Sequence, residues 1–179
     1  MEWNVRLARE EDISALESLI PVSVRELQAA YYSPAQMTGA LGSVFGVDRQ
    51  LILDGTFFVV EENQKIAGCG GWSRRRSHYG ADCGRKDEDP LINPETEPAR
   101  IRAFFVHPAF ARRGIGRHIM QACESAIRAA GFRMAGIVAT LAGEPLFAAF
   151  GYEAVERYEI VLSNGLGLPV VRMTKRFET

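Results

Sequence analysis

The stretch that most constrains the fold is a basic, glycine-containing loop between a predicted strand and a long predicted helix. Residues 100–106 form the predicted strand, and residues 114–130 follow with apolar side chains at helical spacing. The apolar stripe of this helix comprises Ile115, Ile119, Cys123, Ala126, Ile127 and Ala130. Residues 135–140 form the next predicted strand. Such a strand-helix-strand unit crosses over right-handed between parallel strands, so it defines the centre of the fold.

The remaining predicted elements surround that unit. Strands are predicted at residues 4–7, 56–61, 65–73, 155–162 and 170–177, and helices at 8–20, 21–32, 34–41 and 145–150. Residues 77–98 are polar and are interpreted as one long surface loop. The order of elements predicts an α/β (α+β) domain in which helices cover a mixed sheet of six to seven strands. The length of 179 residues fits a single domain, 1–179.

Composition narrows the range of functions. The formal net charge of -1 gives the chain no overall attraction for nucleic acid or for an anionic membrane, so we expect neither as a partner. No apolar run approaches the roughly 18 residues that cross a bilayer, and the first residues do not resemble a secretory signal. The cysteines Cys69, Cys83 and Cys123 lack metal-ligand spacing, which favours a reduced, cytoplasmic protein without a metal site. Cys69 is interpreted as a core residue rather than a nucleophile.

The loop before the long helix has the chemistry of an anion site. Backbone N–H groups at a helix N-terminus lack partners and carry the positive end of the helix dipole. Gly114 and Gly116 have no side chain, so a ligand can approach the backbone closely. Arg112 and Arg113 add charged donors that suit phosphate oxygens. The sequence therefore predicts a pyrophosphate-sized anion at Arg112-Arg113-Gly114-Ile115-Gly116.

Two nucleotide-binding patterns fit this loop poorly. A Walker loop needs Lys followed by Ser or Thr after its second glycine, and no such pair follows here. The dinucleotide pattern follows the first strand and needs a third glycine, whereas this loop lies late in the chain and has Ile119 at that position. A nucleotide-binding protein that uses the same loop stays open as a hypothesis, and it predicts stabilisation by ATP or NAD and none by CoA.

This stretch resembles the GCN5-related N-acetyltransferase family. The family signature is Gln or Arg, two residues, Gly, one residue, then Gly or Ala; residues 111–116 match it except at Ala111, which occupies the first position. The preceding Phe-Phe-Val-His-Pro and the following apolar helix are similar to the family. So are residues 145–152, a short predicted helix that ends in Gly151 and Tyr152. The order of elements is similar along nearly the whole chain.

The resemblance implies an acetyl-CoA site in a core of about residues 99–151, between two central strands that splay apart. The residues that it implies for the cofactor are Phe104, Phe105, Val106, Arg112, Arg113, Gly114, Ile115, Gly116, Arg117, His118, Thr140, Leu146 and Phe147. It implies transfer of an acetyl group to a primary amine by direct attack in a ternary complex. The alternative is a catalytically weak member that binds acyl-CoA as a sensor or partner module.

No catalytic residue is assigned from the sequence. Many members of the family have a tyrosine where this chain has Phe147, so the general acid is open. Tyr152 is interpreted as a core aromatic residue, His107 as a residue that shapes the loop, and His118 as a helix-surface residue or a phosphate neighbour. His78 carries no assignment.

The predicted substrate face includes Tyr31, Tyr32, Trp72 and Arg74 together with the long loop. The three consecutive arginines 74–76 would suit an acidic substrate, although a solvated strand end is the simpler interpretation. The expected acceptor is a small molecule or another amine-bearing substrate. Its identity, the acyl-chain preference and the oligomeric state are open, and the family's habit of pairing through late strands leaves a homodimer as one option.

Overall fold

The computed structural model describes residues 2–79 and 89–179, and its strands form one mixed sheet. The seven strands lie in the order β1-β2-β3-β4-β5-β7-β6. They are β1 (Asn4–Leu7), β2 (Phe57–Glu62), β3 (Lys65–Ser73), β4 (Ala99–Val106), β5 (Met134–Thr140), β6 (Glu153–Val161) and β7 (Gly167–Arg176). β4 and β5 run parallel, and the other neighbouring pairs run antiparallel. The predicted mixed sheet and its parallel crossover are confirmed.

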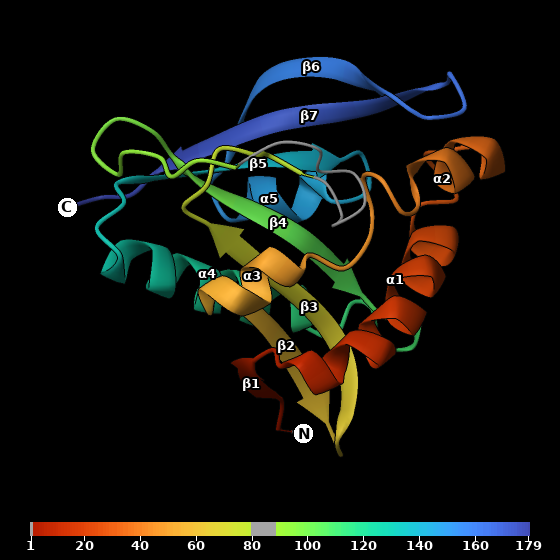
Figure 1. Ribbon diagram of the computed structural model, residues 1–179, viewed down its shortest axis with the longest axis horizontal. Helices are drawn as coiled ribbons and strands as arrows, with labels where there is room; N and C mark the ends of the chain where they lie inside the picture. The colour runs from red at the N-terminus through yellow and green to blue at the C-terminus, as the bar shows by residue number, and fades with distance from the viewer. Residues whose placement is uncertain (1, 80–88) are drawn as a thin grey trace.

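Helices cover both faces of this sheet (Figure 1). One face carries α1 (Ile13–Leu27), α2 (Pro34–Ala40) and α3 (Arg49–Asp54), and the other carries α4 (Ile115–Ala129) and α5 (Glu144–Ala149). Short 3-10 turns, η1 (Glu10–Asp12) and η3 (Pro108–Phe110), precede α1 and α4. Each face encloses a separate hydrophobic core. Among the described helices, none has the length and apolar character needed to span a membrane.

Glycines on β3 let α4 lie directly against the sheet. A Cβ added at Gly68 would lie 2.7 Å from Cγ2 of Ile115, and one added at Gly70 would lie 2.6 Å from Cγ2 of Ile119. Both isoleucines are buried, at 1% and 0% exposure. Burying such a side chain contributes about 1.5–3 kcal/mol, so this contact holds the N-terminal turns of α4 against β3.

One helical expectation is wrong, and one helix was missed. The predicted break at Pro21 is absent, because α1 continues through Pro21 and ends at Leu27 rather than near Tyr32. Its buried residues lie on both sides of the proline, namely Leu16, Leu19, Ile20, Ser23 and Val24, so the packing of one continuous face offsets the backbone hydrogen bond that proline removes. The six-residue helix α3 was not predicted.

Candidate functional site

The two central strands separate halfway along their length. β4 and β5 pair from Ala99↔Ala135 to Ile101↔Ile137 and no further among the described residues. Ala103 has a left-handed φ of 54°, and the β3–β4 register shifts beside it. This irregularity bends β4 away from β5. The C-terminal halves of the two strands therefore splay, as the resemblance implied, and leave a gap in the sheet.

Backbone groups of β4 point into that gap. Hydrogen-bonding directions alternate along a strand, and the N–H of His107 donates to the carbonyl of Ala67 on β3 at 2.8 Å. The N–H of Val106, one residue earlier, therefore points the other way, toward β5. The gap consequently offers main-chain donors and acceptors rather than a closed ladder.

A groove of about 620 Å³ runs from the N-terminus of α4 into this gap. Its walls come from residues 104–106 of β4, the loop and first turn of α4, residues 140–146, and the last turns of α1. Gly114, Gly116, Arg112 and Arg117 all line it, which places the predicted anion-binding loop on the groove. The unpaired N–H groups of the α4 first turn make this end of the groove suited to a phosphate.

The two glycines of the loop have different physical roles. Gly114 is the N-cap of α4 with φ 86° and ψ 7°, a left-handed conformation that glycine adopts without strain. Gly116 instead provides space, since a Cβ there would lie 2.9 Å from Cδ2 of Leu146 on α5. Gly114 therefore allows the turn before α4, and Gly116 leaves space between α4 and Leu146.

The arginines and the histidine of this region separate into two sets. Arg112 and Arg117 line the groove. Arg113 does not, because its guanidinium lies 5.0 Å from the Trp3 ring centroid and 5.5 Å from that of Phe110, with an ion pair to Glu62 at 3.6 Å. These contacts draw Arg113 toward β1 and β2, so its predicted phosphate contact is not supported. His118 is half-buried on α4 and lines neither the groove nor the pocket described next.

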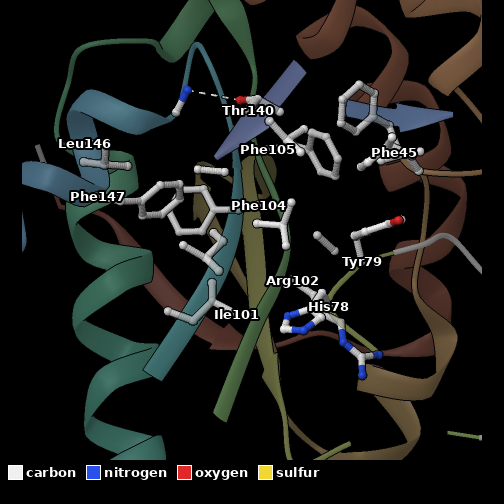
Figure 2. Close-up of a pocket in the computed structure, with 18 of the residues that line it drawn as sticks. Phe45, His78, Tyr79, Ile101, Arg102, Phe104, Phe105, Thr140, Leu146 and Phe147 are labelled. Carbon is white, nitrogen blue, oxygen red and sulfur yellow. Dashed lines mark hydrogen bonds between the residues drawn. The ribbon is translucent and has the colours of Figure 1, made fainter. Parts of the chain in front are cut away.

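A second, smaller cavity lies on the other side of the gap. This pocket has a volume of about 110 Å³ and is lined by residues of β4, β5, β6 and β7, by Leu146 and Phe147 of α5, and by residues 44–46, 78–79 and 143 of three loops. It shares Phe104, Phe105, Thr140, Gly143 and Leu146 with the groove, so the two spaces meet between the splayed strands. Figure 2 shows Phe104 and Phe147 at one end of the pocket and His78 and Tyr79 at the other.

Aromatic pairs form the walls where the spaces meet. Phe104 packs edge-on against Phe147, with ring centroids 5.4 Å apart, and Phe45 packs in the same way against Phe105 at 5.9 Å. Thr140 ends β5 and accepts a hydrogen bond from the N–H of Gly143 through Oγ1 at 3.1 Å, which ties the start of α5 to the strand. The Phe147 side chain supplies no hydroxyl, so it cannot donate a proton.

Sequence reasoning missed most of the pocket. Val44, Phe45, Ile160 and Val170 come from three distant segments, and their apolar character is that of ordinary core residues. His78 stood without a role, yet the structure places it on the pocket. Burial, together with the positive charges of Arg100, Arg172 and Arg102, lowers its pKa to about 4. The imidazole is therefore neutral at pH 7.

Three of the four predicted substrate residues lie away from both spaces. Tyr31 lines the groove rather than the pocket. Tyr32 is buried, because its hydroxyl donates to the carbonyl of Pro169 at 2.6 Å and accepts from the N–H of Leu141 at 3.0 Å. Trp72 is 2% exposed in the core beneath α4, and Arg74 lies over its ring at 5.2 Å from the centroid. These three side chains contribute packing, not a described binding surface.

The next two arginines hold loops in place. Arg75 makes a bidentate ion pair with Asp54 at 2.8 and 3.0 Å, and Arg76 lies 3.6 Å from Glu97. Arg102, on β4, pairs with Asp89 at 2.8 Å, and Asp89 also accepts from the N–H of Ser77 at 2.7 Å. This network joins the two described ends of the long loop to the sheet, so it positions His78 and Tyr79.

The other candidate catalytic groups are structural. Nδ1 of His107 accepts from the N–H of Ala109 at 3.1 Å, which shapes η3. Tyr152 is buried, its hydroxyl donates to Glu124 at 3.0 Å, and burial raises its pKa. Cys69 is fully buried, and burial raises its pKa to about 12. Cys83 lies outside the described residues, which hold no group of His, Cys, Asp and Glu able to bind a metal.

The comparison with protein families identifies the domain. The family model of the acetyltransferase (GNAT) domain matches residues 53–154, which is more than half of the chain. This span includes β2 to β5, α4 and α5, and therefore most of the groove and pocket walls. The chain belongs to the GNAT acetyltransferase family.

Solved structures share the fold over the full chain. A GCN5-related N-acetyltransferase from Rhodopseudomonas palustris is 21% identical with a TM-score of 0.73, covering 97% of this chain and 95% of that one. PaiA N-acetyltransferase from Thermoplasma acidophilum, in complex with coenzyme A, is 12% identical with a TM-score of 0.67 and coverage of 99% and 100%. YncA from Salmonella typhimurium, with acetyl-CoA, is 16% identical with a TM-score of 0.66 and coverage of 100% and 96%. No curated protein matches the chain.

Proposed function

We propose that this chain is a single-domain N-acetyltransferase that moves an acetyl group from acetyl-CoA to a primary amine. The observation that carries the proposal is that the groove at the α4 N-terminus opens, through the gap between β4 and β5, into a separate pocket. A transferase needs two ligands whose reacting ends meet, and these two spaces share five lining residues. The structures of PaiA and YncA that share this fold hold CoA and acetyl-CoA.

The residues of the groove fit the parts of CoA. The first-turn N–H groups of α4 would hold the pyrophosphate, with Arg112 and Arg117 adding charge. The β4 edge at residues 104–106 and the opposing Thr140 and Leu146 would hold the pantetheine arm. Its amide groups can pair with strand backbone as a neighbouring strand would. This arrangement directs the thioester toward the pocket.

Direct attack accounts for the reaction. The lone pair of the amine nitrogen forms a bond to the thioester carbonyl carbon, and an electron pair moves onto the carbonyl oxygen. The inward-pointing N–H of Val106 is placed to donate to that oxyanion. The C=O bond then re-forms and the C–S bond breaks with its electron pair on sulfur. The nitrogen loses one proton and the thiolate takes up one, so the products are the N-acetyl amide and CoA.

A CoA-binding sensor is the second candidate, and Phe147 is the observation that favours it. A thiolate with a pKa of about 8.5 leaves without obligatory protonation, so the absent hydroxyl does not by itself prevent turnover. A thiol-release assay with a panel of amines separates the two functions. Release with any amine supports the transferase, whereas tight CoA binding without release in every pairing supports the sensor.

The first experiment is a calorimetric titration with CoA, ATP and NAD. The proposal predicts binding of CoA alone, because the groove fits a pyrophosphate followed by an extended arm along β4. Binding of ATP or NAD with no binding of CoA would contradict it. The same titration with acetyl-CoA, followed by the thiol-release assay, then tests turnover.

A further inference from the structure

The pocket beyond the gap differs from the groove in its charged side chains, because the exposed Arg112 and Arg117 line the groove alone. Most of its lining residues are apolar, among them Phe45, Ile101, Ile137 and Val170. Among the described lining residues, the ionisable side chains are those of His78, Tyr79 and Arg102, and none is Asp or Glu. A ligand in this pocket therefore meets mostly hydrocarbon and, among the described lining residues, no carboxylate.

The guanidinium of Arg102 already forms ion pairs within the protein, so it cannot bind a ligand through both of its Nη atoms. Its side chain is 1% exposed, one Nη lies 2.8 Å from Asp89, and the other lies 3.5 Å from Asp48. Its Nε–H is buried without a hydrogen-bond partner, and so is Nδ1 of His78. Among the described lining residues, these two atoms are the buried side-chain polar atoms without a hydrogen-bond partner.

The lowered pKa of His78 shows that the surroundings of this side chain disfavour a positive charge. The charged groups that act on it are Arg100 and Arg102 from β4 and Arg172 from β7. Together with burial, they disfavour the imidazolium form. Of these arginines only Arg102 lines the pocket, and its charge is balanced by Asp89 and Asp48. An ammonium ion placed in the pocket would lose its water and gain no carboxylate from the described lining residues, so burial disfavours it.

We propose that the acceptor is a small, weakly basic amine with an apolar body, such as an arylamine, which enters the pocket uncharged. This inference rests on the proposed function and specifies its second substrate. The volume of about 110 Å³ suits a compact ring or a branched chain at the reacting end of the acceptor. An uncharged amine already carries the lone pair that attacks the thioester, so no carboxylate is required to deprotonate it before attack.

The test compares three compounds that share a six-membered ring: aniline, cyclohexylamine and cyclohexanol. Each is titrated into the protein saturated with CoA, between pH 6 and 9. Aniline and cyclohexanol are uncharged over this range, and their affinities should not change with pH. Cyclohexylamine is an ammonium ion at pH 7, so its apparent Kd should be weaker than that of cyclohexanol and should fall about tenfold for each unit of rising pH.

The opposite pattern would overturn the inference. Cyclohexylamine that binds more tightly than cyclohexanol at pH 7, with an affinity independent of pH, would mean that the pocket recognises the ammonium ion. Acetylation of spermidine or lysine in preference to aniline, measured as thiol release, would have the same meaning. So would the absence of binding by all three compounds.

A substitution that adds a carboxylate sharpens the test. Val44 lines the pocket from a loop and is half-buried, so Val44→Asp should raise cyclohexylamine affinity at pH 7 at least tenfold relative to cyclohexanol. Thr38→Asp, at an exposed position of α2 outside the pocket, is the matched control and should leave the ratio unchanged. An unchanged ratio in a folded Val44→Asp protein would count against the inference.

The CoA titration distinguishes failure of the proposed function from failure of the inference about the acceptor. If the wild-type protein does not bind CoA, the proposed function fails and the inference fails with it. If CoA binds and an amine is acetylated, but the ammonium form is the one that binds, only the inference about the acceptor fails.

Discussion

The groove and the pocket meet between β4 and β5 but differ in the charged groups that they offer a ligand. The groove offers backbone N–H groups and two arginines at the start of α4, an arrangement suited to a charged ligand of fixed structure. The pocket offers apolar side chains and an imidazole that burial keeps neutral. The contrast indicates that changes in the groove should alter CoA affinity for every acceptor, whereas changes in the pocket should alter the acceptor alone.

The largest expected effect comes from charge in the groove. Gly116→Glu places a carboxylate where the pyrophosphate would lie and crowds Leu146, so CoA affinity should fall at least about a hundredfold, or about 3 kcal/mol. Ser125→Glu adds the same charge to an exposed position of α4 and should leave affinity unchanged. Calorimetry on both folded variants gives the comparison, and equal affinities would show that the pyrophosphate lies elsewhere.

A change in the pocket should have the converse effect. Phe45→Leu removes the edge-on contact with Phe105 while keeping an apolar side chain. Aromatic pairs of this kind contribute about 0.5–1.5 kcal/mol, so the KM for the amine should rise up to about tenfold while CoA affinity stays the same. Steady-state kinetics with CoA titration checks both. A parallel loss of CoA affinity would mean that the two spaces are not separable.

The low pKa of His78 should make the free energy of unfolding depend on pH. Its pKa is about 4 in the folded protein and roughly 6.5 when unfolded, so the unfolded chain binds the proton more readily between these values. Stability should therefore fall as pH drops through this window, by about 1 kcal/mol after allowance for solvent screening. Urea unfolding at pH 7.5 and 5 should show this loss in the wild type and a smaller one in His78→Gln; equal losses would contradict the burial of the imidazole.

The smallest effect should come from one groove arginine. Arg112→Ala removes a charge beside the anion site but leaves the backbone donors of α4, so CoA affinity should fall only about threefold. Arg113→Ala is the matched control, because Arg113 contacts Trp3, Phe110 and Glu62 instead of the groove. The CoA affinities of the two variants are compared by calorimetry at low salt, where charge screening is weakest. A larger loss for Arg113→Ala than for Arg112→Ala would reverse the assignment.

The sequence predicts the groove because one continuous segment builds most of it. The anion-binding loop with Gly114 and the apolar stripe of α4 are local patterns that can be read from the residues. The β4 wall at Phe104, Phe105 and Val106 was implied by the family resemblance. The orientation of Arg113 could not be predicted in this way, because Trp3 and Glu62, which hold its side chain, come from distant strands. The continuity of α1 through Pro21 likewise depends on a buried face that only the packed sheet provides.

Most of the pocket could not be predicted from the sequence, because its lining residues come from distant segments of the chain. Val44, His78, Ile160 and Val170 are separated by long stretches of chain, and each has an ordinary local explanation. Their common role arises from the splay of β4 and β5, which rests on the left-handed conformation of Ala103. Alanine rarely adopts that conformation, so the residues around Ala103 do not predict the bend in β4.

A crystal structure of the protein with CoA tests the central claim most directly. We expect the pyrophosphate against the first-turn N–H groups of α4, between Gly114 and Arg117, and the thiol in the gap beside Phe104 and Thr140. CoA bound elsewhere on the surface at saturating concentration, with the α4 N-terminus empty, would contradict the account.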